Sequence, residues 1–227
     1  MDSFLSPEEI DSIPAEKLES FLKQRRWYGA KSKKLVEHKA VDVINIESQP
    51  VQLAIAIIET LFDDDTKETY QLVVRQQGAR AEILNDALDD AEACQSLYEV
   101  IRDHKEFDGR AGRVRIRRGS DFQKDHFPIS SIQPLSQEQS NSSVVFGDAL
   151  FLKLFRNIVF GLNPDFEISL FLMRHPIFNH SPNLYAVMEY AGKEEPATLA
   201  FVQEYIRATG SALDFATEAV NLYLDNP

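Results

Sequence analysis

The sequence predicts an α+β protein, with a helix on an antiparallel sheet followed by a second antiparallel sheet with its own helices. Three observations predict this fold class. Runs rich in β-branched residues recur along the chain, stretches of helical apolar periodicity separate them, and short polar segments join neighbouring runs. The chain has 227 residues, of which 44% are hydrophobic. This length and apolar content suit one or two folded domains and exclude a disordered tail.

The charge and cysteine content exclude several kinds of partner. Asp and Glu number 36 against 24 Lys and Arg, so the net charge of -12 would repel a nucleic-acid backbone. The lone Cys94 cannot form an internal disulfide, and the few His residues give no Cys/His metal framework. Neither a signal-peptide pattern nor an apolar run of membrane-spanning length occurs. We therefore expect a soluble cytoplasmic protein that binds neither nucleic acid nor a membrane.

The first subdomain is expected to begin with a helix. Ser12 is the expected N-cap, Pro14 falls in the first turn, and one apolar stripe follows at Leu18, Phe21 and Leu22. The helix should end near Trp27 and Tyr28, whose rings are expected to pack on the adjoining sheet.

The sheet of this subdomain is expected from three β-branched runs, at residues 41–46, 51–58 and 70–74, with a polar hairpin-like connection at 63–67. The strand signal stops around residues 78–80, and we place the first boundary there, which gives a subdomain of residues 1–80.

The second subdomain, residues 81–206, opens with helical spacing from 87 to 101. Five Arg residues lie between 110 and 118, and their alternation with Val114 and Ile116 favours a half-exposed strand over an anion site. The later elements are expected as strands at 129–135, 143–146, 150–155, 184–190 and 198–206, and as helices at 164–174 and 212–224. The last helix falls in a third segment, residues 207–227.

One strand carries a charged residue with a possible role. Phe151, Lys153 and Phe155 share one face of the run 150–155, and a buried ammonium needs a partner. Glu167, on the following helix, is the candidate. A strand Lys paired with a helix Glu after a small-residue turn is how protein kinases hold ATP phosphates. The pattern alone equally fits a Lys153 that extends to solvent from an edge strand and an ordinary exposed Glu167.

Four segments resemble bacterial maltokinases, in family order. Residues 24–33 resemble the segment that closes the first helix of that family's cap subdomain, and residues 139–156 its phosphate turn and lysine strand. Residues 163–167 resemble the next helix, and 197–206 the strand that enters the interlobe hinge. The resemblance implies a cap subdomain, 1–80, followed by a eukaryotic-protein-kinase-like N-lobe and then the hinge and first helix of a C-lobe.

The resemblance also implies a function. Maltokinases transfer the γ-phosphoryl group of ATP, with Mg²⁺, to the anomeric hydroxyl of maltose in trehalose and glycogen metabolism, and are often fused to a trehalose synthase domain. By resemblance, Lys153 would bind the α/β-phosphates and Glu167 would orient it. The phosphate-covering turn would be Gln139, Ser140, Asn141, Ser142 and Ser143, and backbone groups of Glu204, Tyr205 and Ile206 would meet adenine. Ala30 stands where the family commonly has Gly, which puts the conformation of that turn in question.

The catalytic motifs of the family are not found in this span. No His-Gly-Asp run occurs, and Asp165-Phe166-Glu167, which spells the family's metal motif, lies before the hinge strand at a helix start. Asp165 is therefore interpreted as a first-turn acid that the helix dipole favours. We expect no catalytic or metal residue here, no nucleotide bound to this fragment and no turnover by the 227 residues alone.

The expected partners follow from the same resemblance. They are the C-lobe of the same polypeptide, maltose in the full enzyme and, in fused members, the trehalose synthase domain. Without a C-lobe, apolar residues at 184–206 and 212–224 should be uncovered and favour self-association. The alternative function is a non-catalytic cap that docks onto a trehalose synthase.

Overall fold

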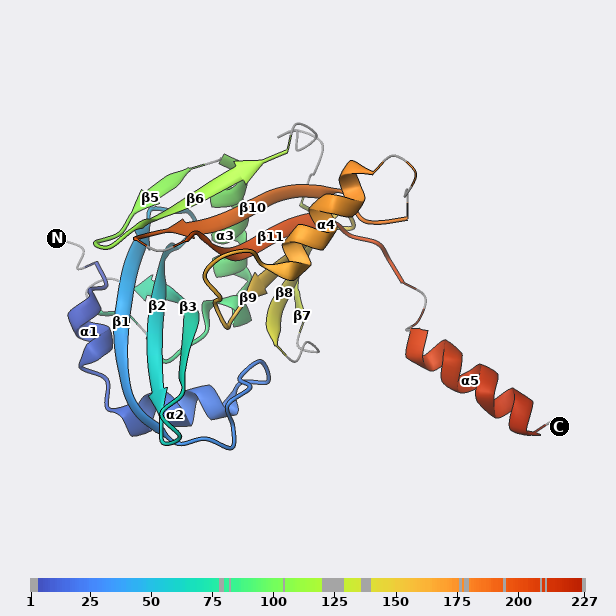
Figure 1. The fold of residues 1–227 in the computed structure, drawn as a ribbon. Coiled ribbons are helices and arrows are strands. Elements are labelled where there is room, and N and C mark those ends of the chain that lie inside the picture. The colour runs from blue at the N-terminus through green and yellow to red at the C-terminus, as the bar shows by residue number, and fades with distance from the viewer. Residues whose placement is uncertain are drawn as a thin grey trace.

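The computed structural model describes residues 4–77, 80–81, 83–103, 105–119, 129–135, 140–175, 177, 180–193, 195–208, 210 and 212–225. Over these residues the chain is α+β, with two antiparallel sheets and a few helices (Figure 1). No helix among them has both the length and the apolar character that a membrane span requires.

The first sheet has the order β1-β2-β3-β4, formed by Leu35–Ile46, Gln52–Phe62, Lys67–Gln77 and Arg80–Ala81. Its central strand β2 is buried on both faces. Ala54, Ala56 and Ile58 face a core shared with the first two helices, whereas Ile55 and Ile57 face the core shared with the second sheet. This burial explains why β2 is a nearly continuous apolar run instead of an alternating one.

Two helices, α1 (Pro7–Asp11) and α2 (Ala15–Gln24), cover the outer face of this sheet (Figure 1). The predicted apolar stripe of α2 is confirmed, because Leu18, Phe21 and Leu22 are all buried. The predicted N-cap is wrong. Ser12 ends α1, and Pro14 occupies the N-cap position of α2. The helix α1 was not predicted, although Ser6 and Glu9 form a capping box at its start.

The second sheet has the order β5-β6-β10-β11-β9-β8-β7 among the described residues. Its strands are Glu106–Asp108, Arg113–Arg118, Ile132–Leu135, Asn141–Phe146, Leu150–Phe155, Leu184–Ala191 and Ala197–Glu204 for β5 to β11. In β6, Val114 and Ile116 are buried while the Arg side chains are exposed, so the predicted half-exposed strand is confirmed. Arg113 and Arg117 pair with carboxylates of neighbouring strands, which is typical of a solvated sheet face.

The helix α3 (Ala91–Asp103), preceded by the short 3-10 turn η1 (Ala87–Asp89), lies between the two sheets. Its buried side chains, among them Cys94, Leu97 and Ile101, join residues of β2 and of β9 in one core. The cap sheet and the second sheet are therefore packed together through a common apolar interior and not simply linked in sequence.

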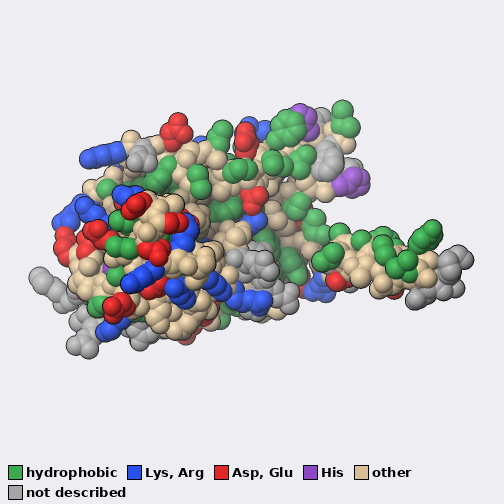
Figure 2. All heavy atoms as spheres, turned by 60° about the horizontal axis from the view of Figure 1, so that its bottom comes forward, with side chains coloured by type: hydrophobic (Ala, Val, Ile, Leu, Met, Phe, Trp, Pro, Cys, Tyr) green, Lys and Arg blue, Asp and Glu red, His purple; other side chains and the backbone are tan. Residues whose placement is uncertain are grey.

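The helix α4 (Pro164–Arg174) covers the opposite face of the second sheet, and α5 (Ala212–Asp225) stands away from the body (Figure 1). The expectation that residues 184–206 are uncovered is wrong for the strands themselves. β10 and β11 are inner strands of the sheet, so their apolar side chains are buried. The expectation holds for α5, whose apolar side chains are exposed and run along the helix in Figure 2.

Candidate nucleotide-binding site

Lys153 lies on β9, a central strand of the second sheet. Its direct cross-strand neighbours are Phe201 on β11 and Ser143 on β8, and residues opposite each other in an antiparallel pair share a face. Phe155 lies two positions farther along the same face, with its ring centroid 5.8 Å from the Lys153 ammonium. The predicted aromatic flanking of Lys153 is confirmed, and an outer-edge position is excluded.

The helix α4 covers this face. Asn163 caps its start by accepting a hydrogen bond from the backbone N–H of Phe166 at 3.1 Å. The Phe166 ring lies 6.4 Å from that of Phe201, and Leu170 packs beside it. The capping residue and these two apolar anchors hold the first turn of α4 close to Lys153.

The ammonium of Lys153 points to α4 but meets a different carboxylate from the one predicted. Its Nζ donates to Oδ2 of Asp165 at 2.8 Å. The Lys153 side chain is 23% exposed and that of Asp165 52%, so the pair borders solvent. The interpretation of Asp165 as a first-turn acid is confirmed.

The predicted pair of Lys153 with Glu167 does not form in this structure. Each residue of a helix is rotated by roughly 100° from the one before, so side chains two residues apart differ by about 200° and point to nearly opposite sides. With Phe166 and Leu170 against the sheet, Asp165 flanks the apolar face on one side and Glu167 on the other. Glu167 is exposed.

The residues of the predicted phosphate turn do not all belong to one turn in the structure. Gln139 lies outside the described residues, Ser140 precedes β8, and Asn141, Ser142 and Ser143 belong to the strand itself. The side-chain Nδ2 of Asn141 donates to Oγ of Ser140 at 3.1 Å. Ser143 is buried, and its Oγ has no hydrogen-bond partner among the described residues. β8 therefore begins at Asn141, inside the predicted turn.

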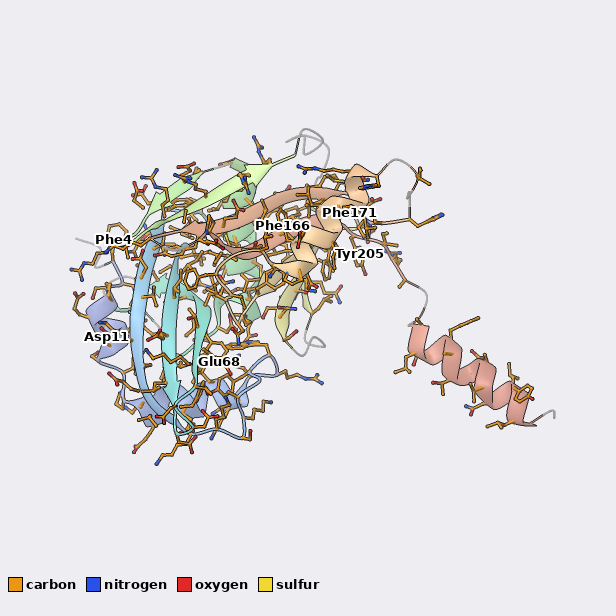
Figure 3. The ribbon with its side chains drawn as sticks, viewed as in Figure 1. Phe4, Asp11, Glu68, Phe166, Phe171 and Tyr205 are labelled. Atoms are coloured by element: carbon orange, nitrogen blue, oxygen red, sulfur yellow. The ribbon has the colours of Figure 1, made fainter. Side chains whose placement is uncertain are left out.

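The predicted hinge follows β11. The backbone N–H of Glu204 donates to the carbonyl of Asn183 at 2.8 Å, and that of Tyr205 to the carbonyl of Ala149 at 2.8 Å. These two amides are thus used inside the fold, whereas the N–H of Ile206 has no hydrogen-bond partner among the described residues. Figure 3 shows Tyr205 where β11 leads out of the sheet, and Phe166 and Phe171 on α4.

Two buried polar junctions join the cap to the second sheet, and neither was predicted. The first is built on Arg156, a fully buried residue that follows directly after β9. Its Nη2 donates to Oδ2 of Asp86 at 2.6 Å, its Nε donates to Oγ of Ser142 at 2.7 Å, and its Cζ lies 4.8 Å from the ring centroid of Trp27. The predicted packing of Trp27 and Tyr28 in the cap is confirmed by their burial.

The second junction is built on Asp42 of β1, a residue that is 1% exposed. It accepts hydrogen bonds from the turn at 110–112 and from the hydroxyl of Tyr190 on β10. A Cβ on Gly109 would lie 2.4 Å from Asp42 Oδ2, so the close approach requires Gly there. Burial, followed by the charge of Asp42, raises the pKa of Tyr190 above its ordinary value.

A metal site is not evident in the part of the chain that the structure describes, because no group of three His, Cys, Asp or Glu side chains there is placed to hold an ion. Cys94 does not supply a reactive group. Burial, with a smaller contribution from nearby Asp residues, raises the pKa of its thiol to about 12.

Taken together, these elements define a class of protein. A strand hairpin, a lysine strand, a covering helix and two strands that lead to an exit segment follow one another in the order of a kinase N-lobe. A helix-on-sheet cap is packed against it.

Comparisons with known proteins agree with this class. Residues 21–93 match the family described as the maltokinase N-terminal cap domain. Residues 21–93 are thus similar to a maltokinase cap, which confirms the predicted resemblance for this segment, and a sheet-rich region follows it.

Solved structures with a similar fold include glucosamine kinases. A glucosamine kinase in complex with glucosamine, ADP and inorganic phosphate matches with a TM-score of 0.55 and 11% identity, over 93% of this chain and 43% of that one. Glucosamine kinase in crystal form B matches with a TM-score of 0.56 and 11% identity, over 93% of this chain and 42% of that one. Crystal form A matches with a TM-score of 0.51 and 12% identity, over 76% of this chain and 36% of that one. This chain therefore spans less than half the length of these kinases, and the likeness concerns the fold.

Proposed function

We propose that the polypeptide containing this chain is an ATP-dependent maltose 1-kinase, to which the chain contributes the cap and the N-lobe. One observation carries the proposal. Lys153 projects from a central strand of a kinase-like sheet toward the covering helix, at a place open to solvent, and a maltokinase-type cap precedes it. In this reaction the γ-phosphorus forms a bond to the anomeric oxygen of maltose, its bond to the bridging oxygen breaks so that ADP leaves, and the anomeric hydroxyl gives up its proton.

The residues near Lys153 suit the nucleotide end of such a site. The Lys153 ammonium would exchange Asp165 for the α/β-phosphates, with an attraction strengthened by its half-buried surroundings. The N–H of Ile206, which has no partner among the described residues, would serve adenine, while those of Glu204 and Tyr205 are already bonded. Glu167 would reach Lys153 only after α4 rotates about its axis. Mg²⁺ would be held through the phosphates and by residues beyond those described.

A coupled assay of ADP release tests the proposal on the complete polypeptide. Lys153→Ala should lower kcat/KM for maltose phosphorylation by about 100-fold or more, the size expected when one charge-stabilising group is lost. Lys67→Ala is the matched control, because Lys67 forms an ion pair with Glu59 at 2.7 Å on the cap surface. Equal activity of the Lys153 and Lys67 variants would refute the role of Lys153. The 227 residues alone should show no turnover.

The second candidate function is a module that docks onto a trehalose synthase. Exposed apolar side chains on α5, such as Phe215 and Leu222, favour a partner of some kind. A docking module would leave maltose phosphorylation absent from the complete polypeptide, and a pull-down with trehalose synthase would separate the two functions.

A further inference from the structure

A groove lies beside α4 on the outer face of the second sheet, and we call it the α4 groove. Its volume is about 270 Å³, far more than the roughly 10–15 Å³ that admits one water. The floor is apolar and is formed by side chains of α4 and β10, namely Phe166, Leu170, Met173, Leu184 and Val187. Four of these five side chains belong to one packed cluster, so the floor is a fixed surface. The groove therefore has room for apolar side chains of another segment.

The rim of the α4 groove is basic. Arg117 and Arg118 border it at the end of β6 and Arg174 at the end of α4, and no Asp or Glu is among the described residues that line it. Arg117 pairs with Glu189 outside the groove, and Arg118 donates to the carbonyl of Arg102. Arg174 is exposed and has neither a hydrogen bond nor an ion pair within the described part of the chain. In a chain with a net charge of -12, such a rim favours an acidic partner with an apolar face.

The helix α5 of this chain has the matching chemistry. It contains no Lys or Arg, and Asp214 and Glu218 lie four residues apart on one side. The rest of its surface is largely apolar and exposed (Figure 2), with Leu213, Phe215, Val220, Leu222, Tyr223 and Leu224. A helix of 14 residues is marginal in water unless an apolar face is packed. An apolar floor with basic margins is the surface that α5 requires.

The chain leaves the second sheet next to the α4 groove. The N–H of Glu204, the last residue of β11, donates to the carbonyl of Asn183, and the adjacent Leu184 lines the groove. From there the chain carries α5 away from the body (Figure 1). Two copies that meet at this end about a two-fold axis place each α5 next to the groove of the other copy. One symmetric contact then covers both grooves and both helices.

We propose that α5 docks its apolar face into the α4 groove of a second copy of the chain, while the groove of the first copy receives α5 of the second. Removal of the two apolar surfaces from water drives the contact. The acidic side of α5 lies toward the Arg rim and sets the orientation of the helix. The exchange concerns the 227-residue protein and does not depend on the proposed function.

Sedimentation velocity of the 227-residue protein over a concentration series is the first test. The wild type should show a monomer–dimer equilibrium. Arg174→Glu places a carboxylate opposite an acidic helix and should raise the dissociation constant about tenfold or more. Met173→Glu is a second groove variant, since Met173 is 37% exposed and tolerates a polar side chain. Lys67→Glu makes the same change in net charge as Arg174→Glu on the cap surface and should leave the constant unchanged.

A mixing experiment separates exchange from unspecific apolar association. Arg174→Glu keeps an intact α5, whereas Phe215→Gln with Leu222→Gln keeps an intact groove and a helix-forming α5. Each variant alone loses both contacts of the dimer, but a mixture retains one intact contact of α5 with a groove. The mixture should therefore contain more dimer than either variant alone at the same total concentration.

Three results would overturn the proposal. The first is a wild type that stays monomeric up to its solubility limit, which is also the result expected if α5 binds the groove of its own chain. The second is an equal dissociation constant for the groove variants and Lys67→Glu. The third is a mixture with no more dimer than its separate components, which would mean that the apolar side chains of α5 associate without the groove.

Discussion

Replacement of Asp42 by Ala should lower the free energy of unfolding by about 3–5 kcal/mol. The carboxylate accepts five hydrogen bonds within the described residues. The donors are the N–H groups of Val43, Arg110, Ala111 and Gly112 at 2.9, 2.8, 3.1 and 2.8 Å, and the hydroxyl of Tyr190 at 3.0 Å. Alanine removes every one of these acceptors, and the β5–β6 turn is then held by its own ladder and by the exposed Arg110–Glu8 ion pair.

The size of this loss in the free energy of unfolding depends on which donors can form a hydrogen bond to water once the carboxylate is gone. The Val43 N–H and the Tyr190 hydroxyl bond to Asp42 in buried surroundings, and each costs roughly 1–3 kcal/mol when it is left unpaired. The amides of the turn at 110–112 are partly exposed and regain water, so each contributes less. Asp42→Asn keeps one acceptor oxygen and should cost about 2 kcal/mol.

Urea unfolding followed by far-ultraviolet circular dichroism measures these differences. Asp63→Ala is the matched control, because Asp63 accepts a backbone hydrogen bond from Lys34 at 3.1 Å on an exposed turn. It should change stability by about 0.5 kcal/mol or less. An Asp42→Ala midpoint equal to that of Asp63→Ala would refute the view that this carboxylate joins the cap to the second sheet.

Three further predictions concern other sites. Cys94 should resist a thiol reagent at pH 8 in the folded protein and react fully in urea, because burial raises its pKa to about 12; rapid labelling without urea would contradict this. Burial raises the pKa of Tyr28 to about 12 and also raises that of Tyr70, so these phenols release their protons at lower pH in the unfolded chain than in the folded protein. The free energy of unfolding should therefore fall as pH rises above about 9. Urea midpoints that stay constant from about pH 8 to 11 would be the contrary result. Phe215→Lys with Leu222→Lys should reduce concentration-dependent association in light scattering relative to wild type, since both apolar side chains are exposed; unchanged scattering would exclude α5 as the contact.

Local patterns predicted much of the fold. The stripe Leu18, Phe21 and Leu22 faces the cap core, and the Val114 and Ile116 alternation gives a half-exposed strand. In both cases the residues inside one element determine which face is buried, so periodicity is sufficient. The face that carries Lys153 was predicted for the same reason.

The contacts between elements were not predictable in this way. Whether Asp165 or Glu167 meets Lys153 depends on how α4 is rotated, and that rotation is set by Phe166 packing on Phe201. The Arg156–Asp86 pair joins residues 70 positions apart. Sequence spacing carries no information on such a pair, although an Arg at the end of the apolar run 150–155 was a signal that a buried partner exists.

The central claim is tested most directly by the product that the complete polypeptide makes from maltose and ATP labelled at the γ-phosphate. The account predicts a labelled disaccharide phosphate that no longer reduces alkaline copper, because the anomeric hydroxyl carries the phosphate, and it predicts that Lys153→Ala slows its formation by about 100-fold or more. Label transfer to another hydroxyl would contradict the proposed reaction, and transfer at the wild-type rate in Lys153→Ala would contradict the site.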